Sequence, residues 1–277
     1  MRFLFVSLLL VTIFYFLSGR ALFRAEIIFF NVGQGDSFAL RTPGGKVIVV
    51  DGGPDWSCLY YLGKWLGFGR RQIDILIFTH DHNDHFAALP EILMRYRVGR
   101  IFLPARLSDS SKSYLETSWS SDFVVPENLN ENKCFNLEAN CHLCLFPPSA
   151  EFLSAKDEND LSMVLHFACD SLSLVAAGDA GEKRERQLLS LDFNWHAQVF
   201  KASHHGSASA NSEEFLRAVS PLAMIFSVGA SNKYKHPAVE IIERARRLGI
   251  KMWRTDQMGS ILLYANNRQL FFKSGGF

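Results

Sequence analysis

The sequence predicts an α/β fold in which two sheets are sandwiched between helices. Two observations support this prediction. Short apolar runs typical of buried strands recur along the chain, and amphipathic runs typical of helices stand between many of them. Several apolar runs also end directly at histidine or aspartate, as strands do in α/β folds whose ligands collect beyond the carboxyl ends. Helices on the outer sides of two stacked sheets would bury the remaining apolar faces.

The first half of the chain supplies strands in quick succession. Pro43-Gly44-Gly45 stands between two apolar runs and predicts a hairpin turn. Residues from about 105 to 140 are polar and rich in Ser, Asn and Glu, and we interpret them as a connection or insertion. The predicted strands are residues 25–30, 37–42, 46–51, 73–78 and 100–104, and the predicted helices are residues 59–68 and 86–99.

The second half continues the same alternation. Ser212 is well placed to cap one predicted helix, and Gly249 to end another. The predicted strands are residues 141–146, 162–168, 171–177, 197–203, 222–229, 251–255, 260–265 and 269–273. The predicted helices are residues 182–191, 212–219 and 238–249.

The amino terminus differs from the rest of the chain. Residues 3–17 are an unbroken run of apolar and hydroxyl side chains after a basic start, which favours a signal peptide or an amino-terminal membrane anchor over residues 1–23. We therefore expect export or anchoring in the cell envelope, and one domain over residues 24–277. A net charge of +1 gives no general attraction to polyanions, so any nucleic-acid binding would need a local basic patch.

Three of the five cysteines lie close together, at Cys134, Cys141 and Cys144. A zinc knuckle would need a fourth ligand, and only His142 is near in sequence. In an exported chain one disulfide within this group is an alternative. Ordinary buried thiols are the third interpretation.

A histidine-rich loop follows the predicted strand at 73–78. Residues 80–85 read HDHNDH, and neutral imidazoles and carboxylates are the ligands of zinc, iron and manganese. The spacing would present the first two histidines to one ion, and Asp84 with His85 to a second. Asp179 also follows an apolar strand and would bridge two ions about 3.5–4 Å apart, which activate a water for ester hydrolysis.

His204 and His205 follow another predicted strand. Because neighbouring residues of an extended chain point in different directions, one of the two is expected to bind metal directly, and His205 is preferred. The other is expected to act beside the ion or on the substrate.

These residues belong to a set of stretches that resembles a known family. The stretches NVGQGDS, VIVVDGG, THDHNDH, ENDLSMVL, AAGD, KASHHGS and NKYKHP run from Asn31 to Pro237. They are similar to the metallo-β-lactamase superfamily and, more narrowly, to the hydrolase domain of ComEC competence proteins. The resemblance implies an αββα sandwich with two mixed sheets between helices, and a hydrolase with two divalent ions, zinc or manganese. It implies as metal ligands His80, His82, Asp84, His85, Asp179 and one of His204 and His205, with Asp51 as a support residue.

The chain also departs from the family pattern. Ala87 and Ala88 replace the two glycines usual after the histidine-rich loop. The histidine that usually completes the first metal site has no clear counterpart, so we expect either that Asn159 or Asp160 substitutes for it or that the first site is weak. The large membrane channel of ComEC proteins is not expected here, because the chain has one apolar leader.

Other residues of the family stretches are expected to act on the substrate. Asn159, Ser162 and Lys233 are expected to bind it, and Asp84 to take part in catalysis. His236 is expected to contact a phosphate or to donate a proton to the leaving group. The alternative for His236 is a structural loop histidine before the helix that follows Pro237.

The leading functional hypothesis is phosphodiester hydrolysis, with single-stranded DNA or a small phosphodiester as substrate and a role in DNA uptake. Basic groups on the predicted helices at 182–191 and 238–249 would guide a nucleic-acid backbone, unless they are only solvated surface. One alternative is a lactonase or thioesterase that hydrolyses a carboxylic ester. Another is a component of a DNA-uptake system that binds without catalysis.

Overall fold

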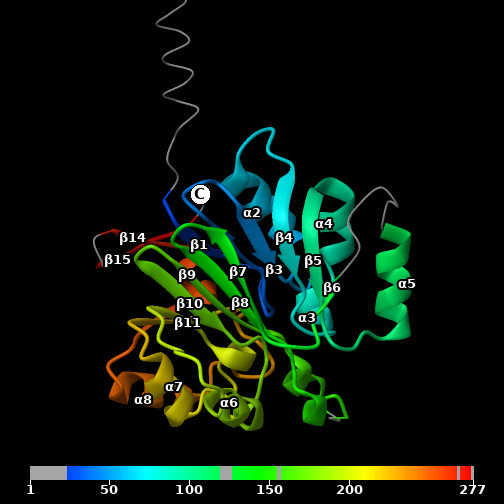
Figure 1. The fold of residues 1–277 in the computed structure, drawn as a ribbon. Helices are drawn as coiled ribbons and strands as arrows, with labels where there is room; N and C mark the ends of the chain where they lie inside the picture. The colour runs from blue at the N-terminus through cyan, green and yellow to red at the C-terminus, as the bar shows by residue number, and fades with distance from the viewer. Residues whose placement is uncertain (1–23, 119–126, 155–156, 267–268, 276–277) are drawn as a thin grey trace, which may run out of the picture.

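A computed structural model describes residues 24–118, 127–154, 157–266 and 269–275 (Figure 1). Two sheets form its middle layers. The first has eight strands in the order β15-β14-β1-β2-β3-β4-β5-β6, and the second has seven in the order β13-β12-β11-β10-β9-β8-β7. Both sheets contain parallel and antiparallel pairs, so both are mixed. The expected αββα sandwich is confirmed, and the predicted leader at 1–23 lies outside the described residues.

The strands are short, as the apolar runs predict. The first sheet consists of β1 (Glu26–Phe29), β2 (Phe38–Arg41), β3 (Val47–Val50), β4 (Gln72–Ile77), β5 (Arg97–Leu103), β6 (Glu127–Asn128), β14 (Ile261–Asn266) and β15 (Gln269–Ser274). The second consists of β7 (Lys133–Glu138), β8 (Cys141–Phe146), β9 (Val164–Cys169), β10 (Leu172–Ala176), β11 (Val199–Lys201), β12 (Ala223–Phe226) and β13 (Lys251–Arg254).

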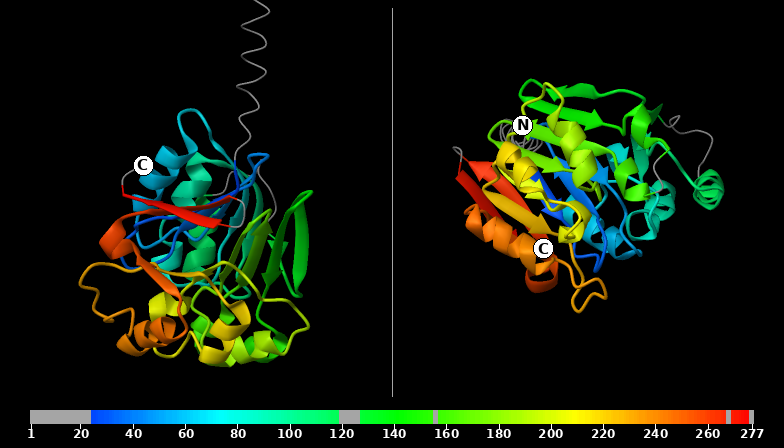
Figure 2. Two further views of the ribbon diagram at one scale, coloured as in Figure 1. Left: turned by 90° about the vertical axis from the view of Figure 1, so that its left-hand side faces the viewer. Right: turned by 90° about the horizontal axis from the view of Figure 1, so that it is seen from below.

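Helices cover the outer face of each sheet (Figure 2). Those on the first sheet are α2 (Ser57–Leu66), α3 (Asn83–Phe86) and α4 (Leu89–Arg95), with α5 (Asp109–Ser118) against α4. Those on the second are α6 (Glu182–Leu189), α7 (Glu213–Val219) and α8 (Val239–Arg247). Short turns of helix are α9 (Thr255–Met258), η1 (Ala150–Phe152), η2 (Glu158–Leu161) and η3 (Ser203–Gly206).

Strand β1 shows why the sandwich needs an apolar layer on each side of a sheet. Successive side chains of a strand point to opposite faces. Ile27 and Phe29 therefore enter the core between the two sheets, while Ile28 and Phe30 pack under the outer helices. All four are fully buried, and burial of such a side chain contributes roughly 1.5–3 kcal/mol.

Two local predictions are confirmed. Strands β2 and β3 pair antiparallel around the Pro43-Gly44-Gly45 turn, where the Thr42 N–H donates to the Lys46 carbonyl. The Ser212 hydroxyl accepts a hydrogen bond from the Phe215 N–H and caps α7. Both features depend on residues close in sequence, which is why the sequence predicts them well.

Two other predictions need correction. The predicted connection at 105–140 contains α5, β6 and β7. Asp81 holds the start of α5, since its carboxylate accepts from the Ser108 N–H and the Ser111 hydroxyl. The single predicted helix at 86–99 is wrong at both ends: Phe86 is the last residue of α3, and residues 97–99 belong to β5. Only α4 lies within it, with Pro90 in its first turn. In the part of the chain that the structure describes, no helix combines the length and apolar character required to cross a membrane.

Candidate metal centre

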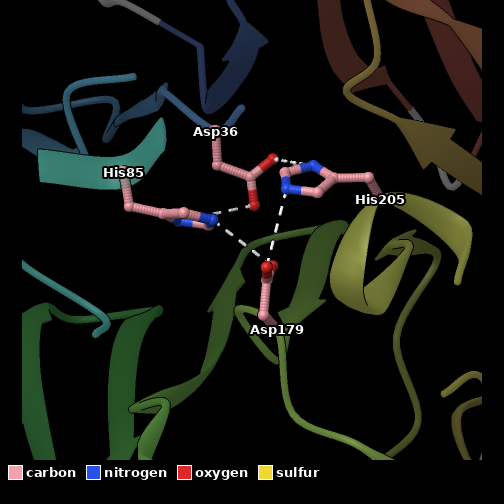
Figure 3. A group of neighbouring side chains, drawn as sticks. All are labelled: Asp36, His85, Asp179 and His205. Atoms are coloured by element: carbon pink, nitrogen blue, oxygen red, sulfur yellow. Dashed lines mark ion pairs between the residues drawn. The ribbon is translucent and has the colours of Figure 1, made fainter. Parts of the chain in front are cut away.

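Four connections that follow strands meet at one rim of the sandwich. They follow β1, β4, β10 and β11, and the first two strands belong to one sheet and the last two to the other. Figure 3 shows the side chains that they bring together: Asp36, His85, Asp179 and His205. The residues come from distant parts of the sequence, so only the packing of the two sheets creates this centre.

The inner cluster consists of Asp36, Asp84, His85, Asp179 and His205. The Nε2 atom of His85 lies 3.4 Å from Asp179 Oδ1. The Nε2 atom of His205 lies 3.6 Å from Asp179 Oδ2 and 3.4 Å from Asp84 Oδ2. Imidazole nitrogens and carboxylate oxygens therefore approach one another, and all of these residues are buried except Asp84, whose side chain is 32% exposed.

The outer cluster consists of His80, His82 and Asp179, so the aspartate is shared with the inner cluster. The Nε2 atom of His80 lies 3.8 Å from Asp179 Oδ2, and the rings of His80 and His82 lie 4.6 Å apart. His80 is fully buried, whereas the His82 side chain is 35% exposed. The outer cluster therefore faces the solvent side of the centre.

The buried histidines fit a metal site because one ring nitrogen of each is already engaged. His80 Nδ1 is 3.1 Å from the Thr79 hydroxyl, His85 Nδ1 is 2.8 Å from Asp51, and His205 Nδ1 is 3.0 Å from the Ser227 carbonyl. The Nε2 atoms of the three rings and Asp179 Oδ1 are buried and have no hydrogen-bond partner among the described residues. Buried polar atoms rarely lack a partner, and outer contacts of this kind orient metal-binding histidines. The donor set therefore suits divalent cations.

Asp51 holds the histidine-rich loop against the first sheet. Its carboxylate accepts hydrogen bonds from the Thr79 N–H at 2.8 Å and the Thr79 hydroxyl at 2.7 Å. The same carboxylate contacts His85 Nδ1. Burial raises the pKa of Asp51 above its ordinary value, although His85 opposes this. One buried carboxylate thus fixes both the start of the loop and the orientation of a ring.

The surroundings shift the pKa values of the buried histidines in opposite directions. Burial lowers the pKa of His80 well below its ordinary value. Burial acts in the same direction on His85 and His205, but nearby carboxylates, Asp179 above all, raise the pKa of both, that of His205 to about 9. Burial alone would raise the pKa of Asp179, yet His205 and His85 hold it well below its ordinary value. A bound cation would have to displace protons from these rings, since neutral imidazole is the ligand.

Asp36 and Lys201 also belong to the centre, and sequence analysis did not single them out. The Lys201 ammonium forms an ion pair with Asp36 and lies 4.0 Å from Asp179 Oδ1, and its side chain is fully buried. Asp36 Oδ1 lies 3.4 Å from His205 Nδ1. One sequence feature could have indicated Lys201, namely a charged residue at the end of an apolar run. Burial of a charge is costly unless it is paired, so such a residue is expected to have a buried partner.

The turn that carries His204 and His205 has an unusual backbone. Their φ angles are 48° and 53°, so both adopt the left-handed conformation that non-glycine residues rarely take. Gly206 follows with φ 87°, and a Cβ there would lie 2.7 Å from Pro237. The turn places His205 inside, 2% exposed, while His204 is 27% exposed with Nε2 3.8 Å from Asp179 Oδ2. Both histidines thus approach the shared aspartate, with different neighbours.

Asn211 clamps this turn. Its side-chain oxygen accepts from the Ser203 N–H at 2.8 Å, and its amide donates to the carbonyls of Ser203 and Ser207. Its own N–H donates to Glu185 on α6 at 2.7 Å. The left-handed histidine pair is therefore held by a buried hydrogen-bond network that reaches the outer helix layer.

Replacement of Asn211 by Ala is expected to destabilise this turn more than a surface substitution does. Loss of the clamp leaves buried backbone groups unpaired, and the free energy of unfolding should fall by roughly 2–3 kcal/mol. Denaturant unfolding in the presence of a chelator measures this, with Asn130→Ala on an exposed loop as the control. An unchanged unfolding midpoint for Asn211→Ala would show that these hydrogen bonds do not stabilise the turn.

The segment predicted to bind substrate lies beside the shared aspartate. Ser162 is fully buried, and its hydroxyl accepts a hydrogen bond from the Asp179 N–H at 3.1 Å. Gly178 has φ 54°, and a Cβ there would lie 2.9 Å from Ser162, so this close approach requires glycine. Asn159 has a buried side-chain oxygen without a partner among the described residues. In this structure Ser162 supports Asp179 through the backbone.

His236 and Lys233 lie on a loop at the rim of the centre. The His236 ring is 5.7 Å from the His204 ring and stacks on the Tyr234 ring at 5.8 Å. The Lys233 ammonium lies 4.9 Å from the Tyr234 ring centre. Asn232 shapes the loop, since its amide donates to the His236 carbonyl at 2.8 Å and its oxygen accepts from the His236 N–H. The loop therefore places cationic and aromatic side chains next to His204.

Comparisons with known proteins concern the family and the fold. The family model described as the metallo-beta-lactamase superfamily matches residues 30–138. ComE operon protein 3 of Bacillus subtilis (strain 168) is 27% identical over 263 residues, which cover 88% of this chain and 34% of that protein. Competence protein ComA of Neisseria gonorrhoeae is 27% identical over 239 residues, which cover 86% of this chain and 32% of that protein. The chain thus spans about a third of the length of these relatives.

A solved structure supports the same fold. The metallo-beta-lactamase fold protein YhfI from Bacillus subtilis superimposes with a TM-score of 0.55 at 9% sequence identity, covering 91% of this chain and 100% of that chain. At such low identity the likeness concerns the fold alone.

Proposed function

The chain carries a metallo-β-lactamase superfamily domain of the ComEC-like type, and on that premise we propose that it hydrolyses phosphodiesters, with single-stranded DNA as the preferred substrate. The observation that carries this proposal is the cationic and aromatic loop beside Asp179. The competence proteins among its relatives motivate the nucleic-acid substrate and a role in DNA uptake.

The two clusters are suited to hold two divalent ions, zinc or manganese. The inner ion would be held by Asp84, His85, Asp179 and His205, and the outer one by His80, His82 and Asp179. Such ions would polarise a phosphoryl oxygen and lower the pKa of the attacking water. The protein would contribute rigid ligands, exclusion of water from the inner cluster, and the rim that positions the substrate.

The rim loop offers the contacts that a single strand needs. Tyr234 is 55% exposed, so part of its ring is accessible to a nucleobase, and Lys233 and Lys235 provide charge for the phosphate backbone. Stacking and cationic contacts of this kind bind single strands with little sequence preference. From Tyr234 the rings of His236 and His204 lead inward to Asp179, which places the rim next to the proposed point of cleavage.

His236 is suited to hydrogen bonding rather than to ion pairing with the substrate. Burial, together with His204 and His205, lowers its pKa to about 4. The ring is therefore neutral at pH 7. Its Nδ1 atom is buried without a partner among the described residues. We expect this side chain to hydrogen-bond a phosphate or leaving-group oxygen at the rim.

The basic groups on the outer helices play a different part from the rim loop. Arg184 on α6 is buried and donates to the carbonyls of Phe146 and Pro147. Arg247 on α8 pairs with Glu213 at 2.8 Å. These interactions support the interpretation of the helices as structural and solvated surface. Guidance of a nucleic-acid backbone is therefore assigned to the rim loop.

A substrate panel tests the proposal. The full chain is loaded with manganese or zinc and incubated with bis-p-nitrophenyl phosphate, labelled single-stranded DNA and nitrocefin, and Asp179→Asn serves as the inactive control. We expect cleavage of the two phosphodiesters by the wild type only, and weaker DNA cleavage by Tyr234→Ala with the small substrate unaffected. Hydrolysis of nitrocefin alone would contradict the proposal in favour of a carboxylic-ester hydrolase. Bound ions with no hydrolysis at all would favour a non-catalytic role in DNA uptake.

A further inference from the structure

The outer cluster can accept a further protein ligand. Among the described residues it brings together three donors: His80, His82 and Asp179. Protein sites for zinc or manganese usually offer four or more ligands, part of which are waters at catalytic sites. His80 is fully buried, its Nδ1 is next to Thr79, and its Nε2 faces the cluster with no hydrogen-bond partner among the described residues. A side chain that is buried and oriented in this way indicates that the cluster is built for a cation.

One carboxylate outside the cluster lies next to His82. The Oε2 atom of Glu158 lies 3.6 Å from His82 Nε2, on the solvent side of the cluster. We propose that Glu158 is the fourth protein ligand of the outer ion, together with His80, His82 and Asp179. The proposal rests on the metal-dependent function proposed above, and it assigns a residue that neither the resemblance nor the spacing of the motifs indicates.

The backbone around Glu158 is tied to the histidine-rich loop. The Asp157 carboxylate accepts from the Asn159 N–H at 3.0 Å and starts the short helix η2. Just beyond η2, the Met163 N–H donates to the Thr79 carbonyl at 2.9 Å, one residue before His80. Residues 157–163 therefore keep their place relative to the loop, and the Glu158 side chain has only to rotate by its own torsions.

Charge favours the same assignment. The inner cluster has Asp84 and the Lys201-paired Asp36 in addition to the shared Asp179, whereas among the described residues the outer cluster has two imidazoles and the shared carboxylate. A second carboxylate at the outer cluster would balance a divalent ion. Glu158 Oε1 lies 3.9 Å from the Arg106 guanidinium, an exposed pair of the kind that contributes little to stability. Such a weak contact would not hold Glu158 away from an ion.

The other candidates fit this position less well. The Asp160 carboxylate lies beside Gly181 at the start of α6, and the Asn159 side chain is uncharged. His204 Nε2 lies 3.8 Å from Asp179 Oδ2, but its ring also packs against His236 in the rim loop. We therefore assign His204 to the rim and Glu158 to the outer ion.

Ion binding without substrate tests the assignment. Metal content per chain and calorimetric titration with manganese or zinc are compared for the full-length wild type, Glu158→Gln, Glu158→Asp and the matched control Glu151→Gln, an exposed residue on η1. We expect two ions for the wild type and the control. Glu158→Gln should keep the tighter ion and bind the other at least about tenfold more weakly, as loss of even an outer partner costs this much. Glu158→Asp retains a carboxylate, so its affinity for the weaker ion should fall less than that of Glu158→Gln.

Several outcomes would overturn the assignment. The first is that Glu158→Gln binds two ions with wild-type affinity. The second is that Glu158→Gln and Glu158→Asp lose the same affinity for the weaker ion. The third is that the wild type saturates with one ion. Loss of the second ion in His204→Asn, with Glu158→Gln unchanged, would transfer the role to the histidine. Because no substrate is present, each of these results leaves the proposed phosphodiester hydrolysis to be judged separately by the substrate panel.

Discussion

Asp179→Asn is expected to abolish hydrolysis and to remove at least one of the two ions. The carboxylate of Asp179 lies within 3.4–3.8 Å of the Nε2 atoms of four histidines, and it is the one residue common to both clusters. Asparagine has nearly the same shape but no charge, so it cannot balance two cations. The loss of activity should exceed the roughly 10- to 100-fold that follows removal of an outer partner of a metal ligand.

Metal analysis and hydrolysis of bis-p-nitrophenyl phosphate measure the two effects. His82→Ala is the matched comparison, since it should affect only the outer cluster and reduce the content to one ion. Far-ultraviolet circular dichroism establishes that both variants are folded. An Asp179→Asn protein with two ions and wild-type turnover would refute the shared-ligand arrangement, and with it the dinuclear centre.

The second large effect concerns the disulfides of the second sheet. Cys141–Cys169 joins facing residues of β8 and β9, and Cys134–Cys144 joins facing residues of β7 and β8. Simultaneous replacement of Cys141 and Cys169 by Ala should lower the free energy of unfolding by roughly 3–4 kcal/mol, because the bridge closes a 28-residue separation in the unfolded chain. Urea unfolding under non-reducing conditions measures the change.

The second bridge and the free thiol provide the controls. Replacement of Cys134 and Cys144 should lower the free energy of unfolding by less, roughly 2–3 kcal/mol, because these two cysteines are only ten residues apart in sequence. Thiol titration of the unfolded, unreduced wild type should detect one free cysteine, Cys58, which is buried in the native protein. Five reactive thiols would show that the bridges do not form, and equal stability of wild type and both double variants would show that they contribute nothing.

The disulfides correct the sequence analysis of the cysteines. A bridge within the group of three was one alternative, and Cys134–Cys144 is such a bridge. The partner of Cys141 is Cys169, which lies outside the group, so neither Cys141 nor Cys144 remains available for a zinc knuckle with His142. Disulfides persist mainly in oxidising compartments. They fit the expectation that the chain is exported or anchored in the cell envelope, which stays a prediction.

Much of the centre could be predicted because its residues follow strands directly. His80, Asp84 and His85 stand in one short loop, and Asp179 follows another apolar run, so the carboxyl-end rule for α/β folds applies to each. The sequence could not settle the orientation of the 204–205 pair. The rule of alternating side chains assumes an extended chain, whereas both histidines are left-handed and are held so by distant hydrogen bonds.

By itself, the sequence determined the alternation of strands and helices, the hairpin turn, the Ser212 cap and the composition of the histidine-rich loop, because these depend on neighbouring residues. Only the tertiary structure decided that Lys201 is buried against Asp36, that Cys141 meets Cys169, and that Glu158 approaches His82. Each of these contacts joins segments whose distance is set by the packing of sheets and the register of strands, and no local pattern encodes that distance.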